Sequence, residues 1–372
     1  MIHRPPFGAG FFTEGYTVAD YKVLIGDCIQ SMKNLPDQSV NTCITSPPYF
    51  GLRDYGHDGQ IGLEPTPDEF VSALVAVFRE VKRVLRDDGT LWLNLGDSYN
   101  SIGGIHSGRM DNQTGVGAGR RQWREGSARA DGAVRSDGVS RRNRDGTHAP
   151  GLKPKDLIGI PWRVAFALQQ NGWYLRQDII WHKPNPMPES VKDRCTKAHE
   201  YIFLLSKSPK YYFDNGAIMV PAIYGEQHAN KATSWGMNRK HPNKANVADY
   251  AFTGDNKTCH KNDDGAYVKN RRSVWTVTAK PYKGAHFATF PPDLIEPCVL
   301  AGCPEGGVVL DPFGGSGTTA GVALKHGRNA ILCELNPQYA ELIDSRVSEI
   351  VNKPAKKQAN RKLTPEEQQL LF

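Results

Sequence analysis

The stretch VVLDPFGGSGTT, residues 308–319, joins an apolar run to a glycine-rich turn and then to the start of a helix. A second apolar run at residues 329–333 follows and ends at Glu334. Glycines in such a turn let a ligand approach the backbone closely, and an acid at the end of the next strand can accept both hydroxyls of a ribose. Gly315 and Glu334 are 19 positions apart, near the ~20 expected of a nucleoside-binding β-α-β unit. The stretch therefore predicts an α/β fold with a nucleoside-binding turn.

Apolar runs and amphipathic stretches alternate along the chain, which is typical of a mostly parallel, doubly wound sheet covered on both faces. The clearest helix pattern is expected to end at Asp87-Asp88-Gly89, and Pro161 is expected to start a turn or kink its helix. Strands are expected at residues 21–26, 40–45, 90–95, 174–181, 201–206, 308–310 and 329–334, and helices at residues 28–35, 67–85, 155–170, 294–300, 318–325 and 338–347.

A rigid turn, Thr45-Ser46-Pro47-Pro48-Tyr49, follows the apolar run at residues 40–44. Two consecutive prolines fix two backbone angles and donate no N–H groups, so a carbonyl there can point into a cleft. With the Ser46 hydroxyl, it can accept both hydrogens of a planar amino group, while Tyr49 stacks on the ring. The turn suits a nucleobase with an exocyclic amine; an ordinary Pro-Pro turn is the plainer alternative.

The two turns would form one site if their strands were neighbours. Ligands in open α/β sheets bind outside the carboxyl ends of the strands, where the strand order reverses. Neighbouring strands at residues 40–45 and 308–310 would open both turns onto the same crevice. A dinucleotide-binding dehydrogenase competes with this interpretation, because residues 315–320 also fit G-x-G-x-x-A. The tripeptide Asp311-Pro312-Phe313 argues against a dehydrogenase, because the dinucleotide fingerprint does not require it.

The two motifs together resemble those of the S-adenosylmethionine-dependent amino-group DNA methyltransferases. Residues 46–49 (SPPY) resemble the catalytic motif of that family, and residues 311–319 (DPFGGSGTT) resemble its cofactor motif. Their order in the chain resembles the beta group of the family. Further similar segments are Gly26-Asp27-Cys28, Trp181-His182-Lys183-Pro184-Asn185, His199-Glu200, Lys210-Tyr211-Tyr212-Phe213 and residues 290–295. The resemblance covers roughly residues 21–97, 155–214 and 286–349.

This resemblance implies a Rossmann-like methyltransferase fold and methyl transfer from S-adenosylmethionine to the exocyclic amine of a base flipped out of DNA. The implied catalytic residues are Ser46, Pro47, Pro48 and Tyr49. The residues expected to bind the cofactor are Asp27, Phe290, Asp311, Phe313, Gly315, Gly317, Thr318 and Glu334. Serine at the first motif position favours N4 of cytosine as the target. N6 of adenine is the alternative, and an RNA-directed enzyme, a dehydrogenase and an inactive DNA-binding relative remain open.

Basic segments interrupt the α/β pattern. The chain has a net charge of +7, and residues 101–150 hold nine Arg against five acidic residues, while residues 215–275 hold nine Lys and Arg against five. Such segments either grip DNA phosphates or are solvated insertions. The arginines expected to bind DNA are Arg120, Arg121, Arg124, Arg141, Arg142, Arg271 and Arg272.

These segments divide the chain into four predicted parts. The catalytic half is expected at residues 21–214 with an insertion at about 98–150, target recognition at 215–275, the cofactor half at 286–349, and a basic tail at 350–372. The expected partner is double-stranded DNA, and a homodimer and a restriction endonuclease are further candidate partners.

Bulk composition agrees with a soluble enzyme that needs no metal. Hydrophobic residues make up 39% and charged residues 23% of the chain, as in ordinary globular proteins. No run of 18 apolar residues and no signal pattern occurs, so a cytoplasmic location is expected. The seven cysteines include no C-x-x-C pair, and no metal site is expected. Cys28, Cys43 and Cys333 are expected to be buried hydrophobes.

Overall fold

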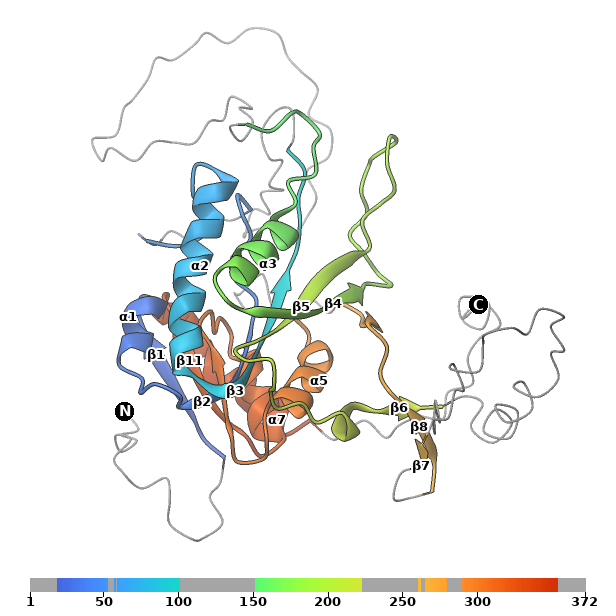
Figure 1. Cartoon of the computed structure of the whole chain (residues 1–372). Coiled ribbons are helices and arrows are strands. Elements are labelled where there is room, and N and C mark those ends of the chain that lie inside the picture. Colours follow the sequence, from blue (N-terminus) through green and yellow to red (C-terminus); the bar gives the residue numbers. More distant parts are fainter. Residues whose placement is uncertain are drawn as a thin grey trace, which may run out of the picture.

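A single large sheet organises the molecule, which we describe from a computed structural model covering residues 19–52, 57, 59–100, 151–222, 260–261, 265–279 and 290–353. The sheet has eight strands in the order β1-β11-β10-β2-β3-β5-β4-β9 (Figure 1). Its strands are β1(Tyr21–Ile25), β2(Val40–Thr45), β3(Leu85–Leu95), β4(Tyr174–His182), β5(His199–Ser206), β9(Val274–Thr276), β10(Val308–Asp311) and β11(Asn329–Glu334).

The strand directions give a mostly parallel sheet. β1, β11, β10, β2 and β3 run parallel to one another, β5 is antiparallel to both β3 and β4, and β9 is parallel to β4. The central strands are buried on both faces, as expected of parallel strands covered by helices. β2, for example, has five buried residues of six. The predicted doubly wound α/β class is confirmed.

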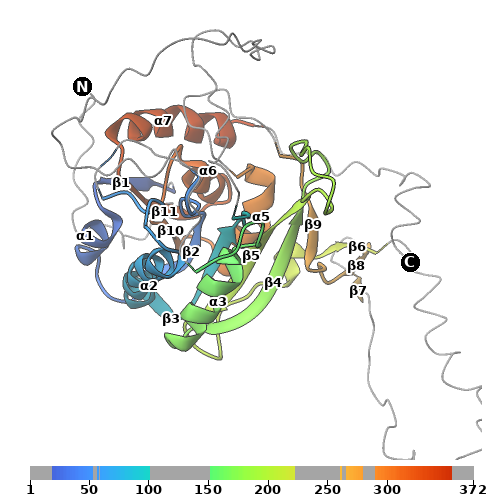
Figure 2. The same ribbon diagram turned by 90° about the horizontal axis from the view of Figure 1, so that it is seen from above.

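Helices cover both faces of the sheet (Figure 2). One face carries α1(Cys28–Lys33), α2(Pro67–Val84) and α3(Ile160–Gln170), and the other carries α5(Pro292–Gly302), α6(Thr318–Lys325) and α7(Pro337–Val351). Each layer has its own apolar core, one around Phe70 and Phe78 and the other around Trp92 and Ile343. Cys28, Cys43 and Cys333 are buried, as predicted. Within the described part of the chain, every helix is too short or too polar to cross a bilayer.

Several helix boundaries differ from those expected by a few residues, and the end of α2 and the start of α3 have a clear physical cause. α2 ends at Val84 rather than at Asp87-Asp88-Gly89, because Leu85 is already extended, fully buried and paired with Val40 of β2. α3 begins at Ile160 rather than near residue 155. Gly159 has a φ of 78°, which interrupts any helix before it, and Pro161 then occupies the first turn, where its missing N–H costs nothing.

The described ends of residues 215–275 contain short elements that the sequence did not reveal. A three-stranded sheet is formed by β6(Val220–Pro221), β8(Tyr267–Lys269) and β7(His260–Lys261), preceded by the 3-10 helix η1(Gly216–Ile218). β9 then returns to the main sheet beside β4. Ile218 and Trp275 are buried in the core on the α5 side. Both described ends of this region are therefore anchored to the body of the protein.

The strands that carry the two motifs are neighbours in the sheet. β10 pairs with β2 in parallel, with Val309 opposite Thr42 and Leu310 opposite Cys43. From this pair the chain winds outward in opposite directions, from β10 to β11 and from β2 to β3. A crevice is expected outside the carboxyl ends of strands at such a reversal. The expected juxtaposition of the two turns is confirmed.

Candidate active site

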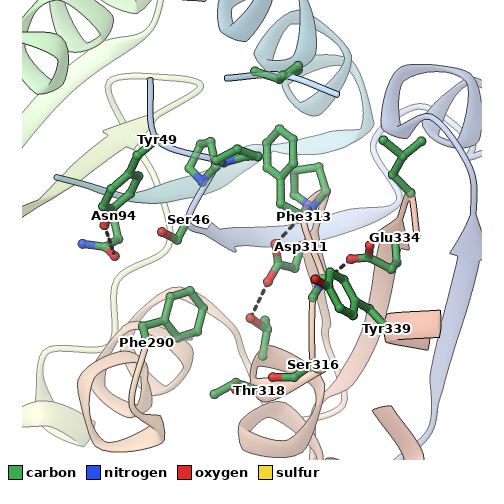
Figure 3. A pocket seen from close by; sticks show the side chains of 18 of the residues that line it. Ser46, Tyr49, Asn94, Phe290, Asp311, Phe313, Ser316, Thr318, Glu334 and Tyr339 are labelled. Carbon is green, nitrogen blue, oxygen red and sulfur yellow. Dashed lines mark hydrogen bonds between the residues drawn. The ribbon is translucent and has the colours of Figure 1, made fainter. Parts of the chain in front are cut away.

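One cavity of about 770 Å³ lies at the carboxyl ends of β2 and β10. Its lining includes every residue predicted to act in catalysis or cofactor binding except Gly317: Asp27, Ser46, Pro47, Pro48, Tyr49, Phe290, Asp311, Phe313, Gly315, Thr318 and Glu334. Figure 3 shows Ser46, Tyr49 and Asn94 at one end, Glu334 and Tyr339 at the other, and Asp311 and Phe313 between them. We call these ends the Ser46 lobe and the Glu334 lobe.

The glycine-rich turn uses its glycines in different ways. Gly315 lines the cavity and has a φ of 52°, in the left-handed region that glycine adopts readily. Gly317 has a φ of 84° at the start of α6, and a Cβ there would lie 2.7 Å from Cγ2 of Ile343 on α7. The lack of a side chain at Gly317 therefore lets α6 and α7 pack closely.

Asp311 joins the two motifs. The residue is only 2% exposed. Its Oδ1 accepts hydrogen bonds from the Thr45 hydroxyl at 2.6 Å and from the Phe313 N–H at 3.0 Å. Its Oδ2 accepts one from the Thr319 hydroxyl at 2.6 Å. Burial raises the pKa of Asp311 above its ordinary value, and these three bonds oppose the rise. Since Thr45 directly precedes Ser46, Asp311 fixes the Pro-Pro turn against the glycine-rich turn.

Glu334 closes the other lobe. Its Oε2 accepts from the Gly315 N–H at 2.7 Å and its Oε1 from the Asn336 N–H at 2.8 Å. Burial raises the pKa of Glu334 above its ordinary value of 4.5, and these two backbone bonds oppose the rise. A carboxylate has about four lone-pair positions. Each oxygen of Glu334 can therefore still accept a hydrogen bond from a ligand.

Tyr49 is held in place by side chains to which sequence reasoning assigned no role. Its hydroxyl donates to Oε2 of Glu200 at 2.7 Å, which also accepts from Nδ2 of Asn94 at 3.3 Å. Oε1 of Glu200 accepts from Lys183, which lies over the Trp181 ring. Lys183 and Glu200 fall in segments that resemble the family, but Asn94 lies in an apolar run with no local signal of function.

The arginines predicted to bind DNA lie away from the cavity or outside the described residues. Nε of Arg271 donates to the Ile218 carbonyl at 3.3 Å, and its guanidinium lies 5.5 Å from the centre of the Trp275 ring. Burial lowers the pKa of Arg271, whereas Arg272 is exposed. Outside the described residues are Arg120, Arg121, Arg124, Arg141 and Arg142. Among the described residues, no cluster of three His, Cys, Asp or Glu side chains is arranged to hold a metal ion.

Comparison with known proteins identifies the class to which this site belongs. The family N6_N4_Mtase, described as DNA methylase, matches residues 40–345. The chain is 45% identical to the Type II methyltransferase M.Cfr9I of Citrobacter freundii over 322 residues, which are 87% of this chain and 86% of that protein. It is 43% identical to the Type II methyltransferase M.SmaI of Serratia marcescens over 326 residues, 88% of this chain and 90% of that protein.

A solved structure shows the same fold. It is the PvuII DNA methyltransferase (cytosine-N4-specific), at a TM-score of 0.54 and 17% identity, covering 90% of this chain and 93% of that one. The chain belongs to the amino-group DNA methyltransferases, the N6/N4 DNA methylase family. The methyl donor of this family is S-adenosylmethionine.

The Glu334 lobe fits that donor. The hydroxyls of Ser316 and Thr318 are buried, line the cavity and have no hydrogen-bond partner within the described part of the chain. Buried polar atoms without partners are uncommon in folded proteins and call for an explanation. A polar ligand in the cavity supplies one, beside a turn whose glycine permits close approach and a carboxylate able to accept hydroxyls. The sequence prediction included Thr318 but missed Ser316.

Proposed function

We propose that this protein transfers a methyl group from S-adenosylmethionine to N4 of a cytosine flipped out of double-stranded DNA. The observation that carries the proposal is that the Ser46 turn and the glycine-rich turn line one cavity, linked through Asp311. Methylation of adenine at N6 is the alternative, because the same lobe could accept either amine. The Type II relatives support a restriction endonuclease as a functional partner.

The Glu334 lobe would hold the cofactor, which supplies a methyl group already activated by its sulfonium. Glu334 would accept the ribose hydroxyls, and the hydroxyls of Ser316 and Thr318 would bond the charged amino-acid end. Phe313 would pack against the cofactor, and Asp27 would bond its adenine or the groups beside it. The Asp27 side chain lines the cavity while its Oδ1 accepts from the Gln30 N–H at 2.9 Å.

The Ser46 lobe would bind and orient the acceptor base. The lone pair of an aromatic amine is delocalised into its ring. Hydrogen bonds from the amine to the Ser46 oxygen and the Pro47 carbonyl favour a tetrahedral nitrogen and stabilise the positive charge that develops on it. Tyr49 would stack on the flipped base. The Ser46 hydroxyl would also donate to the ring nitrogen beside the amine. Because adenine offers N1 where cytosine offers N3, the preference for cytosine rests on serine at the first motif position.

Nucleoside analysis of modified DNA tests this function. Plasmid DNA incubated with the protein and S-adenosylmethionine is expected to yield N4-methylcytosine on digestion and mass measurement, and Ser46→Ala should lower the yield. N6-methyladenine without methylcytosine would refute cytosine as the target. Methylation of a matched RNA without methylation of DNA would refute DNA as the substrate. Sequencing the same plasmid for modified bases gives the recognition site.

The affinity for S-adenosylmethionine is expected to fall as the pH is lowered. The fall should begin at a higher pH than it would for a glutamate with an ordinary pKa. Glu334 can accept hydrogen bonds with both oxygens at full strength only when ionised, and its pKa is raised above 4.5 by burial. As the pH falls through this raised pKa, the carboxyl gains a proton, one oxygen becomes a donor, and the dissociation constant rises. Calorimetric titrations between pH 8 and pH 5 measure this change.

Glu334→Gln is the matched variant for that titration. It should bind the cofactor more weakly at pH 8, since its amide NH₂ faces a backbone N–H, and should lose the part of the pH dependence that Glu334 causes. Asp311, whose pKa is also raised by burial, stays in both proteins. An identical pH profile for the two proteins would therefore show that a group other than Glu334, such as Asp311, causes the effect.

A further inference from the structure

Met187 is the most exposed of the large apolar side chains in the described part of the chain. It is 83% exposed, yet it belongs to the residues that line the active-site cavity. Among the exposed large hydrophobic residues of the described chain, only Leu52, at 46%, shares that position. Burial of a methionine side chain is worth about 1.5–3 kcal/mol. Met187 gains little of this in the free protein, which makes a role in binding the more economical explanation.

The loop that carries Met187 is tied down at its base. It connects β4 to β5 and projects from the sheet in Figure 1. The Lys183 N–H donates to the Ala198 carbonyl at 2.8 Å and closes the loop. Asn185 exchanges two hydrogen bonds with the backbone of Ala279, at 2.9 and 3.1 Å. Met187 is therefore only two residues from a doubly bonded anchor.

The rest of the loop is also held against the body of the protein. Lys155 pairs with Asp193 at 2.6 Å, and the Arg194 guanidinium lies 3.9 Å from the centre of the Tyr99 ring. Prolines at 186 and 188 fix the backbone on both sides of Met187. The exposed thioether is thus presented from a constrained segment, which lowers the entropy cost of using it in a complex.

The chemistry of the loop matches a DNA surface. Residues 183–198 contain four basic and two acidic residues. The loop therefore has a net positive charge, which attracts DNA phosphates. Flipping a base leaves a gap in the stack and costs a few kcal/mol. Apolar side chains, methionine among them, enter such unstacked steps in other DNA complexes. A wedge of this kind has to stand at the entrance of the pocket that receives the base.

We infer that Met187 is a wedge that enters the duplex beside the target and occupies the space left by the flipped base. The inference rests on the proposed function, because it presupposes a duplex substrate whose base enters the Ser46 lobe. Met187 acts before chemistry, on the equilibrium between the stacked and flipped base. It is a positioning residue, and its effect depends on how firmly the target base is paired.

A comparison of paired and mispaired substrates tests the wedge. The substrate is a synthetic duplex with the site that wild-type protein methylates in plasmid DNA, and a second duplex has a non-complementary base opposite the target. In single-turnover assays, Met187→Ala should methylate the paired duplex about tenfold more slowly than wild type. On the mispaired duplex, whose target is already unpaired, it should come within about twofold of wild type. Met187→Leu, which keeps an apolar wedge, should resemble wild type on both.

The controls separate this inference from the proposed function and from misfolding. Val351→Ala, an exposed apolar residue at the end of α7 outside the cavity lining, should change neither rate. An equal loss for Met187→Ala on both duplexes, no loss on either, or weaker binding of S-adenosylmethionine by calorimetry would each overturn the wedge. Failure of the proposed function shows instead in the wild-type protein, as an absence of methylation on both duplexes.

Discussion

Replacing Gly96 with alanine is expected to lower kcat for methyl transfer by about 100-fold. Gly96 follows β3, and a Cβ at this position would lie 2.5 Å from Cε2 of Tyr49. The tyrosine cannot slide along the added methyl group without losing its hydrogen bond to Glu200. Its ring must therefore leave the position proposed for stacking on the base. The affinity for S-adenosylmethionine should stay near that of wild type, because the Glu334 lobe is at the other end of the cavity.

A double-mutant cycle shows whether Gly96 acts through Tyr49. Tyr49→Ala removes the ring that the new methyl group would strike, so Gly96→Ala should cost little more in that background than Tyr49→Ala alone. Interaction energies measured in this way separate coupled from independent sites. Full additivity of the two losses in kcat would contradict the assigned contact. So would a parallel loss of cofactor affinity in the single variant.

Gly315→Val is expected to abolish binding of S-adenosylmethionine. Gly315 has a φ of 52°, and a β-branched residue is a genuine outlier at positive φ. The new side chain would also occupy cavity space beside the Glu334 carboxylate, which now accepts the Gly315 N–H at 2.7 Å. We expect no heat of binding in calorimetry at cofactor concentrations that saturate the wild-type protein.

Two further variants show whether Gly315→Val loses binding through the cofactor site or through misfolding. Gly306→Val imposes similar backbone strain, at a φ of 73°, in a turn where a Cβ would contact nothing within 4 Å, and it should keep cofactor binding. Ser316→Ala removes one hydroxyl that has no described partner and should weaken binding by about tenfold without lowering the melting temperature. Binding by Gly315→Val within threefold of wild type would contradict the placement of the cofactor. If Gly306→Val lost cofactor binding to the same extent, the loss in Gly315→Val would be attributed to misfolding.

Local sequence signals sufficed for the elements that flank the Pro-Pro turn and the glycine-rich turn. The predicted bounds of β2, α6 and β11 match those observed, because each is a buried run or helix next to a turn rich in proline or glycine. The end of α2, in contrast, depended on tertiary structure, whereas the start of α3 follows from Gly159 and Pro161. Leu85 leaves α2 because β2 offers it a buried partner, and no pattern within residues 67–89 contains that information.

The network around Tyr49 was beyond sequence reasoning for a related reason. Asn94 lies on β3, Glu200 on β5, and Lys183 directly follows β4. The register of these three strands decides which side chains face one another. A shift of one residue would turn each of them to the opposite face. The contacts of Arg271 with the Ile218 carbonyl and the Trp275 ring were likewise not visible in the sequence, and its predicted role in DNA binding stays a prediction.

The strand order has a consequence for how the chain is made. β1, the first of the described strands along the chain, pairs only with β11 among those strands, about 300 residues later. β10, also late, inserts between β11 and β2. A nascent chain therefore exposes the unpaired edge of β2 on the ribosome until β10 emerges. Until then, the Pro-Pro turn lacks the glycine-rich turn that completes the cavity. Such long-range pairing slows folding, so a prematurely terminated chain would carry an aggregation-prone edge and no methylating capacity.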